Sequence, residues 1–387
     1  MVKAIKVMLI PNNVQKTKMF QYAGASRFAY NWALAREKEN YEKGGKFISD
    51  SELRKEFTKL RHSEEYAWLL DISNNVTKQA IKDACTAYKN FFKGLQKFPR
   101  FKSKKRSMPK FYQDNVKIQF SHTHVKFEGF SSSRKANKQK MNWVRLAEHG
   151  RIPTDVKYMN PRISFDGLNW WISVCVEFPD CRETLNDDGV GIDLGIKDLA
   201  VCSDGTKYKN INKSQKVKKS EKQKRRLQRS ISRSYEKNKK GESYCKTNNV
   251  IKKEKLLLKR NHRLTNIRKN YLNQTISEII NRKPRFICIE DLNVSGMMKN
   301  RHLSKAVQAQ GFFWFRKQLE YRCSDKGIQL IVADRFYPSS KLCSCCGNIK
   351  KDLKLSDRVY RCACGNMIDR DFQASINLKT YGEKFAS

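Results

Sequence analysis

The sequence predicts an α/β core that follows a small antiparallel β-barrel, with a helical module inserted near the start of the barrel. Three observations support this fold class. Residues 14–98 carry apolar side chains at helical spacing, residues 115–178 contain short alternating runs, and buried strands alternate with helices after residue 189. With 387 residues, the chain is long enough for two or three modules that each bury a core.

The charge of the chain indicates a polyanionic partner. Its net charge is +42, from 80 Lys and Arg against 38 Asp and Glu. Such a charge opposes compaction by self-repulsion unless a polyanion binds. No apolar run approaches membrane-spanning length, and an aromatic content of 11% suits base stacking. The composition therefore favours nucleic acid over a membrane surface.

The chain begins with a strand and then becomes helical. Residues 2–10 alternate like a strand, and they lack the apolar core and cleavage site of a signal peptide. From Val14 to about Phe98, aromatic and small apolar residues recur at three- and four-residue steps, a pattern typical of helix cores. We expect the first strand to join the later barrel, so that the helical module interrupts it.

A basic stretch, residues 98–106, ends the helical pattern. It is bounded by Pro99 and contains two Phe residues, which suits an extended segment that follows a phosphate backbone and stacks bases. A solvated linker explains so short a run equally well. The candidate nucleic-acid contacts here are Arg100, Lys102, Lys104 and Lys105.

Short alternating runs punctuated by Gly, Asn and Ser predict the barrel strands. They are residues 116–120, 125–127, 143–146, 162–165 and 170–178. Continuous apolar runs then predict the strands of the α/β core, each buried on both faces. These are residues 190–195, 199–205, 286–290 and 328–333, with one helix expected from about Leu303 to Lys326.

A strongly basic insertion separates two of the core strands. Residues 207–260 hold 21 Lys and Arg against 4 Asp and Glu. Residues 216–235 are nearly all polar, which predicts a helix that faces solvent or nucleic acid. An apolar stripe from Leu257 to Ile280 predicts a second, long helix packed on one face. The candidate contacts are Lys224, Arg225, Arg226 and Arg229.

Two core strands end in acids, Asp193 and Glu290. A buried carboxylate is costly unless its charge is compensated. Mg²⁺ is the natural partner, and two such ions about 4 Å apart can activate water and stabilise the leaving oxygen of a phosphodiester. The alternative is that both acids cap neighbouring helices. Convergence of these acids with a third would indicate a metal-dependent nuclease.

Asp369 and Asp371 compete for the third position. Asp369 suits the N-cap of the last helix, with Asp371 inside its first turn. Asp371 lies three and seven residues before Ala374 and Leu378 and so shares their inward face. We therefore choose Asp371. Arg370 points elsewhere and either contacts phosphate or lies on the surface.

Twelve cysteines without an export signal indicate a reducing compartment, the cytoplasm, and metal binding. Cys343 and Cys346 are separated by fifteen residues from Cys362 and Cys364, a spacing that suits one structural Zn²⁺. The second pair is one residue shorter than usual, and Cys345 makes the first ambiguous. The remaining cysteines are expected to be buried free thiols: Cys85, Cys175, Cys181, Cys202, Cys245, Cys288 and Cys323.

Several of these motifs together resemble the transposon-encoded TnpB family, which is similar to the compact type V CRISPR effectors. The motifs are Gly191–Gly195, Ile289–Leu292, Ser339–Gly347 and Asp369–Leu378, with weaker matches at Tyr30–Leu34 and Phe98–Lys104. The chain departs from the family at the shortened Cys362–Cys364 pair and at Gln373, where Asn is common.

The resemblance implies an RNase H-like (RuvC) nuclease core with an inserted zinc ribbon, and a wedge-type β-barrel that carries a helical recognition lobe. The implied boundaries are 1–13 and 113–185 for the wedge barrel, 14–112 for the recognition lobe, 186–340 and 367–387 for the RuvC-like domain with its helical insertion at about 207–281, and 341–366 for the ribbon.

The resemblance further implies an RNA-guided DNA endonuclease. A guide RNA from the mobile element pairs with the target strand of double-stranded DNA, next to a short motif that the protein reads. The family's catalytic triad falls on Asp193, Glu290 and Asp371, which would bind two Mg²⁺ ions. Two alternatives stay open: a guide-dependent DNA-binding regulator that no longer cuts, and a DNA-strand transferase.

Overall fold

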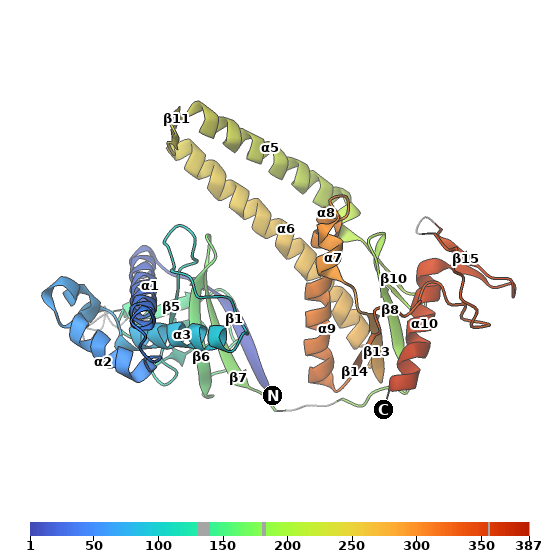
Figure 1. Cartoon of the computed structure of the whole chain (residues 1–387), viewed down its shortest axis with the longest axis horizontal. Helices are drawn as coiled ribbons and strands as arrows, with labels where there is room; N and C mark the ends of the chain where they lie inside the picture. Colours follow the sequence, from blue (N-terminus) through green and yellow to red (C-terminus); the bar gives the residue numbers. More distant parts are fainter. Residues whose placement is uncertain (131–139, 180–182, 355–356, 387) are drawn as a thin grey trace. The chain divides into compact units, whose positions relative to one another are not determined.

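The computed structural model describes residues 1–130, 140–179, 183–354 and 357–386. The chain divides into two compact units, Met1–Pro179 and Asp180–Ser387, each with its own hydrophobic core (Figure 1). Among the described residues, no helix is both long enough and apolar enough to cross a membrane.

The N-terminal unit contains a seven-stranded antiparallel sheet. Its first strand, β1 (Val2–Ile10), pairs with β7 (Trp170–Glu177) along almost its whole length and with β5 (Trp143–Leu146) at its end. This pairing confirms that the first strand joins the later ones. The strand order is β2 (Lys110–Tyr112), β6 (Tyr158–Phe165), β7, β1, β5, β4 (His124–Lys126) and β3 (Gln119–Phe120). Closure of this sheet into a barrel stays a prediction.

Helices occupy the chain between β1 and β2, as the apolar spacing predicted. They are α1 (Asn13–Glu42), α2 (Asp50–Arg61), a 3₁₀ segment (Glu64–Asp71) and α3 (Asn74–Phe92). Capping boxes explain where two of them begin: Asn12 with Gln15 starts α1, and Ser49 with Glu52 starts α2.

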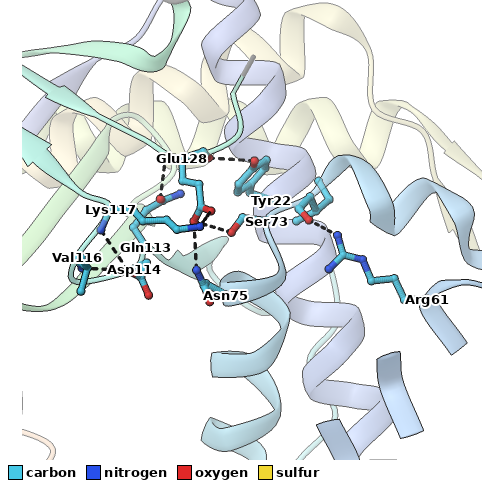
Figure 2. Close-up of polar contacts among 10 residues, drawn as sticks. Tyr22, Arg61, Ser73, Asn75, Gln113, Asp114, Val116, Lys117 and Glu128 are labelled. Atoms are coloured by element: carbon cyan, nitrogen blue, oxygen red, sulfur yellow. Dashed lines mark hydrogen bonds and ion pairs between the residues drawn. The ribbon is translucent and has the colours of Figure 1, made fainter. Parts of the chain in front are cut away.

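A polar junction around Glu128 ties these helices to the sheet (Figure 2). The Glu128 carboxylate accepts hydrogen bonds from Ser73 Oγ at 2.9 Å and Asn75 Nδ2 at 3.2 Å, and it forms an ion pair with Lys117. The Glu128 carbonyl accepts from the Tyr22 hydroxyl of α1 at 3.1 Å. Glu128 follows β4 and contacts both α1 and the start of α3. This single residue therefore attaches the helical module to the sheet.

The C-terminal unit is built on a five-stranded mixed sheet that confirms the four predicted core strands and adds one more. The strands β8 (Val190–Leu194), β13 (Phe286–Glu290) and β14 (Gln329–Ala333) are parallel. β9 (Asp198–Cys202) pairs antiparallel with β8, and β10 (Lys207–Lys209) pairs antiparallel with β9. The strand order is β10, β9, β8, β13 and β14.

Helices cover both faces of this sheet (Figure 1). α6 (Asn248–Ile280) and α9 (Phe312–Lys326) pack on one face, and α10 (Arg370–Phe385) packs on the other. The backbone of α10 lies so close to β8 that a Cβ on Gly191 would come within 2.1 Å of the Ser375 carbonyl oxygen. Glycine at 191 therefore allows α10 to lie directly against the strand that carries Asp193.

The prediction of one helix from Leu303 to Lys326 was wrong, because Gly311 divides it. Gly311 has φ 70°, a left-handed conformation that ends α8 (Ser304–Gln310) before α9 begins. A short helix, α7 (Val294–Lys299), precedes them.

The basic insertion forms an antiparallel pair of long helices, α5 (Gln215–Lys237) and α6 (Figure 1). A small hairpin of β11 (Lys239–Lys240) and β12 (Ser243–Tyr244) joins them. Only Val217 and Ile231 of α5 are buried among its described side chains, which confirms the prediction of a largely solvated helix.

Candidate functional site

The three acids come from elements that meet at one edge of the sheet. Asp193 lies near the end of β8, and Glu290 is the last residue of β13, the parallel neighbour of β8. The register pairs Ile289 with Ile192, so the two acids follow at equivalent positions. Asp371 lies in the first turn of α10, which packs against both strands.

The charges of these acids act on one another. Burial raises the pKa of Asp193 well above its ordinary value, and the charges of Glu290 and Asp371 raise it further. Burial also raises the pKa of Glu290, although a hydrogen bond from Ser339 and the charge of Arg370 oppose this shift. Carboxyls that repel one another in this way would be stabilised by a hard divalent cation, whose charge offsets theirs.

Asp369 caps α10, as the sequence predicted. Its Oδ1 accepts hydrogen bonds from the backbone N–H groups of Asp371 and Phe372, both at 3.1 Å, and its Oδ2 lies 3.4 Å from Lys207 Nζ. Partial burial would raise the pKa of Asp369, but the bond from Phe372 and the charge of Lys207 lower it. Asp369 thus holds the turn that carries Asp371, and its charge acts on Asp193 less than that of Asp371 does.

Arg370 interacts both with the acids and with the segment that separates the two cysteine pairs. Its Nη1 donates to the carbonyls of Lys354 at 3.2 Å and Asp357 at 3.3 Å. Its charge lowers the pKa of both Asp193 and Glu290, so this guanidinium offsets part of their mutual repulsion. A phosphate contact by Arg370 stays a prediction.

Glu290 belongs to a network of hydrogen bonds made by buried polar side chains. Ser339 Oγ donates to the Glu290 carboxylate, and the Ser339 carbonyl accepts from Asn377 Nδ2 of α10 at 2.7 Å. The carbonyl of Leu342 accepts from Asn377 Nδ2 at 2.7 Å and from Gln373 Nε2 at 2.6 Å. Ser339, Gln373 and Asn377 are all buried, so their bonds are shielded from water.

The same network reaches the cysteine cluster. Gln373 Oε1 accepts from Ser344 Oγ at 3.0 Å and from Asn366 Nδ2 at 3.3 Å, and Asn366 Nδ2 also lies 3.5 Å from Cys343 Sγ. A chain of hydrogen bonds therefore connects Cys343 to Glu290. Sequence reasoning missed Ser339 and Asn377. The signal available was a pair of polar residues, Gln373 and Asn377, four apart on the inward face of a helix.

Four cysteines form the candidate metal centre. The Sγ atoms of Cys343, Cys346, Cys362 and Cys364 all lie within 4.8 Å of one another. The distance is 3.6 Å both from Cys343 to Cys364 and from Cys346 to Cys362. Tetrahedral Zn²⁺ with bonds of about 2.3 Å requires sulfur–sulfur distances of about 3.8 Å, so this cluster fits the ion. Among the described residues, no other His, Cys, Asp or Glu side chains form such a group, the three acids included.

The cluster answers both ambiguities of the sequence. The shortened pair contributes both of its cysteines, and Cys345 is exposed and stays outside the group. Burial would raise the pKa of Cys343, but hydrogen bonds from the Cys346 backbone and the Asn366 amide lower it to about 6. The lowered pKa favours the thiolate form of Cys343, which is the form that binds metal.

The other cysteines follow the prediction only in part. Cys85, Cys202, Cys288 and Cys323 are buried free thiols as expected. Cys175 is half-buried, and the prediction for Cys245 was wrong, because this residue follows the solvated β11–β12 hairpin and is exposed. Cys181 lies outside the described residues.

We expect the purified protein to contain one zinc per chain. Cys346→Ser should lose this zinc, because serine replaces a soft thiolate with a poor ligand. Cys345→Ser changes an adjacent exposed cysteine outside the cluster and should retain it. Elemental analysis of the three proteins tests this expectation, and zinc in the Cys346→Ser protein would contradict the assigned ligands.

The predicted basic contacts of the N-terminal unit differ in exposure. Arg100, Lys104 and Lys105 are exposed. Lys102 is half-buried, with its ammonium 2.9 Å from the centre of the Tyr30 ring. Burial, followed by the charge of Lys110, lowers the pKa of Lys102 to about 7. Lys102 therefore packs within its own unit and is the weakest of the four candidates for a phosphate contact.

The predicted basic contacts of α5 line two cavities. Arg225, Arg226 and Arg229 line one of about 760 Å³, together with Arg268 of α6 and Lys305 of α8. Lys224 lines a second, of about 370 Å³, which Arg268 and Lys305 also border.

Neutral and acidic partners hold Arg268 in place between these cavities. Its Nε donates to Asn212 Oδ1 at 2.7 Å, and its Nη2 donates to Glu221 at 2.9 Å. This cationic surface is therefore partly preorganised, as an anion-binding site requires.

Three family models match the chain. Residues 1–46 match one described as a helix-turn-helix domain, residues 173–301 match the IS605 OrfB model described as a probable transposase, and residues 312–378 match a Cas12f1-like TNB domain. In the structure, residues 1–46 form strand β1 and the single helix α1.

Two related sequences and one solved structure are similar to the chain over most of its length. The chain is 30% identical to "Putative RNA-guided DNA endonuclease InsQ" of Escherichia coli K12, over 93% of this chain and 87% of the relative. It is 28% identical to "Putative RNA-guided DNA endonuclease" of Streptomyces pristinaespiralis, over 98% and 89%. A Cas12f1 protein, solved by cryo-EM in complex with sgRNA and target DNA, superposes with a TM-score of 0.61 at 11% identity, covering 98% of each chain.

At such low identity, the likeness to Cas12f1 concerns the fold alone. Together with the four-cysteine cluster, it defines a compact type V-like fold. The sequence identity to InsQ, 30% over most of both chains, is higher than the 11% identity to Cas12f1. The chain belongs to the transposon-encoded TnpB family.

Proposed function

We propose that this protein is an RNA-guided DNA endonuclease of a mobile element. The observation that carries the proposal is that the charges of Glu290 and Asp371 act on Asp193, in a chain whose relatives carry the name "Putative RNA-guided DNA endonuclease". A guide RNA from the element would pair with the target strand of double-stranded DNA next to a short motif. The protein would supply the basic surface and the cutting site.

The three acids would hold two Mg²⁺ ions in an RNase H-like (RuvC) core. When bound, these ions would activate a water molecule and stabilise the leaving oxygen. The chain's own residues prepare this site. Ser339 fixes the Glu290 carboxylate, Asp369 holds the turn that carries Asp371, and Arg370 offsets the repulsion among the acids. The boundaries of the wedge barrel, recognition lobe, nuclease core and ribbon follow the family resemblance.

One experiment separates this proposal from its rivals. The protein, the RNA that copurifies with it and a matched duplex are incubated with and without Mg²⁺. Cleavage that requires both Mg²⁺ and RNA supports the proposal. Binding without cleavage would instead identify a DNA-binding regulator. Joined DNA ends would identify a strand transferase, in keeping with the description of one matching family model as a probable transposase.

Neutralising the α5 contacts should weaken nucleic-acid binding. In Arg225→Gln/Arg226→Gln/Arg229→Gln, we expect the slope of log affinity against log salt to decrease by about 2–3, because each lost phosphate contact removes about 0.7–0.9. The matched control neutralises Lys216, Lys219 and Lys237, which lie on the same helix outside both cavities. Equal slopes for the two variants would contradict a specific role of the cavity.

A further inference from the structure

Glu290, the last residue of β13, is part of the lining of a small cavity. Its volume is about 260 Å³, below the range of about 300–1,000 Å³ typical of pockets for drug-sized ligands. Leu194, Leu292 and Val294 provide its apolar walls. A cavity of this size and polarity suits one planar ring system.

Phe313 lines the cavity and is unusually exposed. The preceding residue, Phe312, is buried in the core of the unit, whereas Phe313 is 64% exposed. An exposed aromatic ring costs solvation free energy in the free protein, and it offers a stacking surface to a partner. Next to a candidate nuclease site, the partner with matching flat faces is a nucleobase.

Two arginines complete the lining, and their charges are already compensated. Arg316 Nη1 donates to Asp291 Oδ1 at 2.7 Å, Arg335 binds the other Asp291 oxygen, and Arg316 also pairs with Glu320 at 3.1 Å. A phosphate would therefore gain little at this point. A neutral base does not need an uncompensated positive charge. A guanidinium group that keeps its ion pair can still stack on a base or donate a hydrogen bond to its edge.

We propose that this cavity binds one unpaired nucleobase of the DNA strand being cut, with Phe313 as the stacking surface. The inference rests on the proposed nuclease function and names the form of substrate that the site takes. A base inside a duplex is already stacked and paired, so only a single-stranded segment places a base here without unpairing. The site thus accepts strands that guide pairing has separated.

The test uses the full protein with its RNA, and single-stranded DNA that carries 2-aminopurine beside the mapped cut position. Binding is measured in the Asp193→Asn background, so that the strand stays intact. Stacking on Phe313 should change the 2-aminopurine fluorescence, and Phe313→Ala should abolish this change and weaken binding about 5- to 150-fold. Phe313→Tyr keeps an aromatic ring and should restore both. Phe385→Ala is the matched control, because Phe385 is 58% exposed in the same unit and lies outside the cavity.

Cleavage by the same variants, without the Asp193 substitution, separates the base-binding site from the nuclease function. The base-binding site is contradicted if the wild type cuts while Phe313→Ala keeps full DNA affinity and the full change in 2-aminopurine fluorescence. This result would leave the nuclease function in place. An equal loss in Phe385→Ala also overturns it, because the effect would then not belong to the cavity. A wild type that fails to cut under matched conditions overturns the nuclease function and the inference built on it.

Discussion

Asp193→Asn is expected to abolish DNA cleavage, leave RNA binding intact and stabilise the metal-free protein. The Asp193 carboxyl is buried among other acids, so its ionised form destabilises the fold without a cation. Asparagine has nearly the same shape and no charge. The expected loss of activity is at least about 1,000-fold, and the melting temperature in EDTA should rise by a few degrees near neutral pH.

The stability of the metal-free protein should depend on pH because of Asp193. The folded-state pKa of Asp193 is raised, so between its ordinary and raised values the folded protein holds a proton that the unfolded chain has lost. The stability of the metal-free wild type therefore falls as pH rises through that window, and this fall should be smaller in Asp193→Asn. Mg²⁺ should raise the melting temperature of the wild type alone. Equal Mg²⁺ effects in both proteins would contradict a metal role for Asp193.

Asp371 and Asp369 offer a matched comparison at the start of α10. Asp371→Asn should abolish cleavage, because it removes a proposed metal ligand. Asp369→Asn should retain most activity, because asparagine caps a helix as well as aspartate and its side-chain oxygen still accepts the two backbone bonds. An inactive Asp369→Asn protein beside an active Asp371→Asn protein would reverse the assignment.

The sequence predicts elements of the site that depend on short stretches of chain. Glu290 ends a continuous apolar run and Asp193 lies near the end of another, and such runs form neighbouring strands in an α/β core. The four cysteines are spaced in two pairs, and the structure brings all four together. These patterns are local, so one segment at a time is enough to recognise them.

Long-range features could not be predicted in this way. Ser339, Asn377 and Gln373 are ordinary polar residues in the sequence, and their importance comes from hydrogen bonds across 31–49 residues of chain. The helix break at Gly311 depends on one backbone angle that a single glycine permits without requiring. The cavity beside Glu290 exists only once β13, α7 and α9 are packed together.

Removal of zinc is expected to abolish cleavage, although zinc touches none of the three acids. Without the metal, the four-thiol cluster loses its main stabilisation, since structural zinc supplies folding free energy directly. Cys343 would then no longer be held in place, and so the hydrogen bonds that connect it to Asn366 and Gln373 would weaken. The chain segment that places Ser339 against Glu290 would become more mobile as a result. Cleavage by Cys346→Ser should therefore fall by more than about 100-fold, with RNA binding retained.

Gln373→Ala separates the network from the metal itself. This variant keeps all four cysteines and should keep zinc, but it removes the side chain that joins Asn366 to the Leu342 carbonyl. We expect a loss of cleavage of about 10- to 100-fold at unchanged zinc content. Thr380→Ala, an exposed change on the same helix, should have little effect. If Gln373→Ala cuts normally while Cys346→Ser does not, zinc must support the nuclease site through the fold of the ribbon as a whole, and the buried hydrogen bonds would serve stability alone.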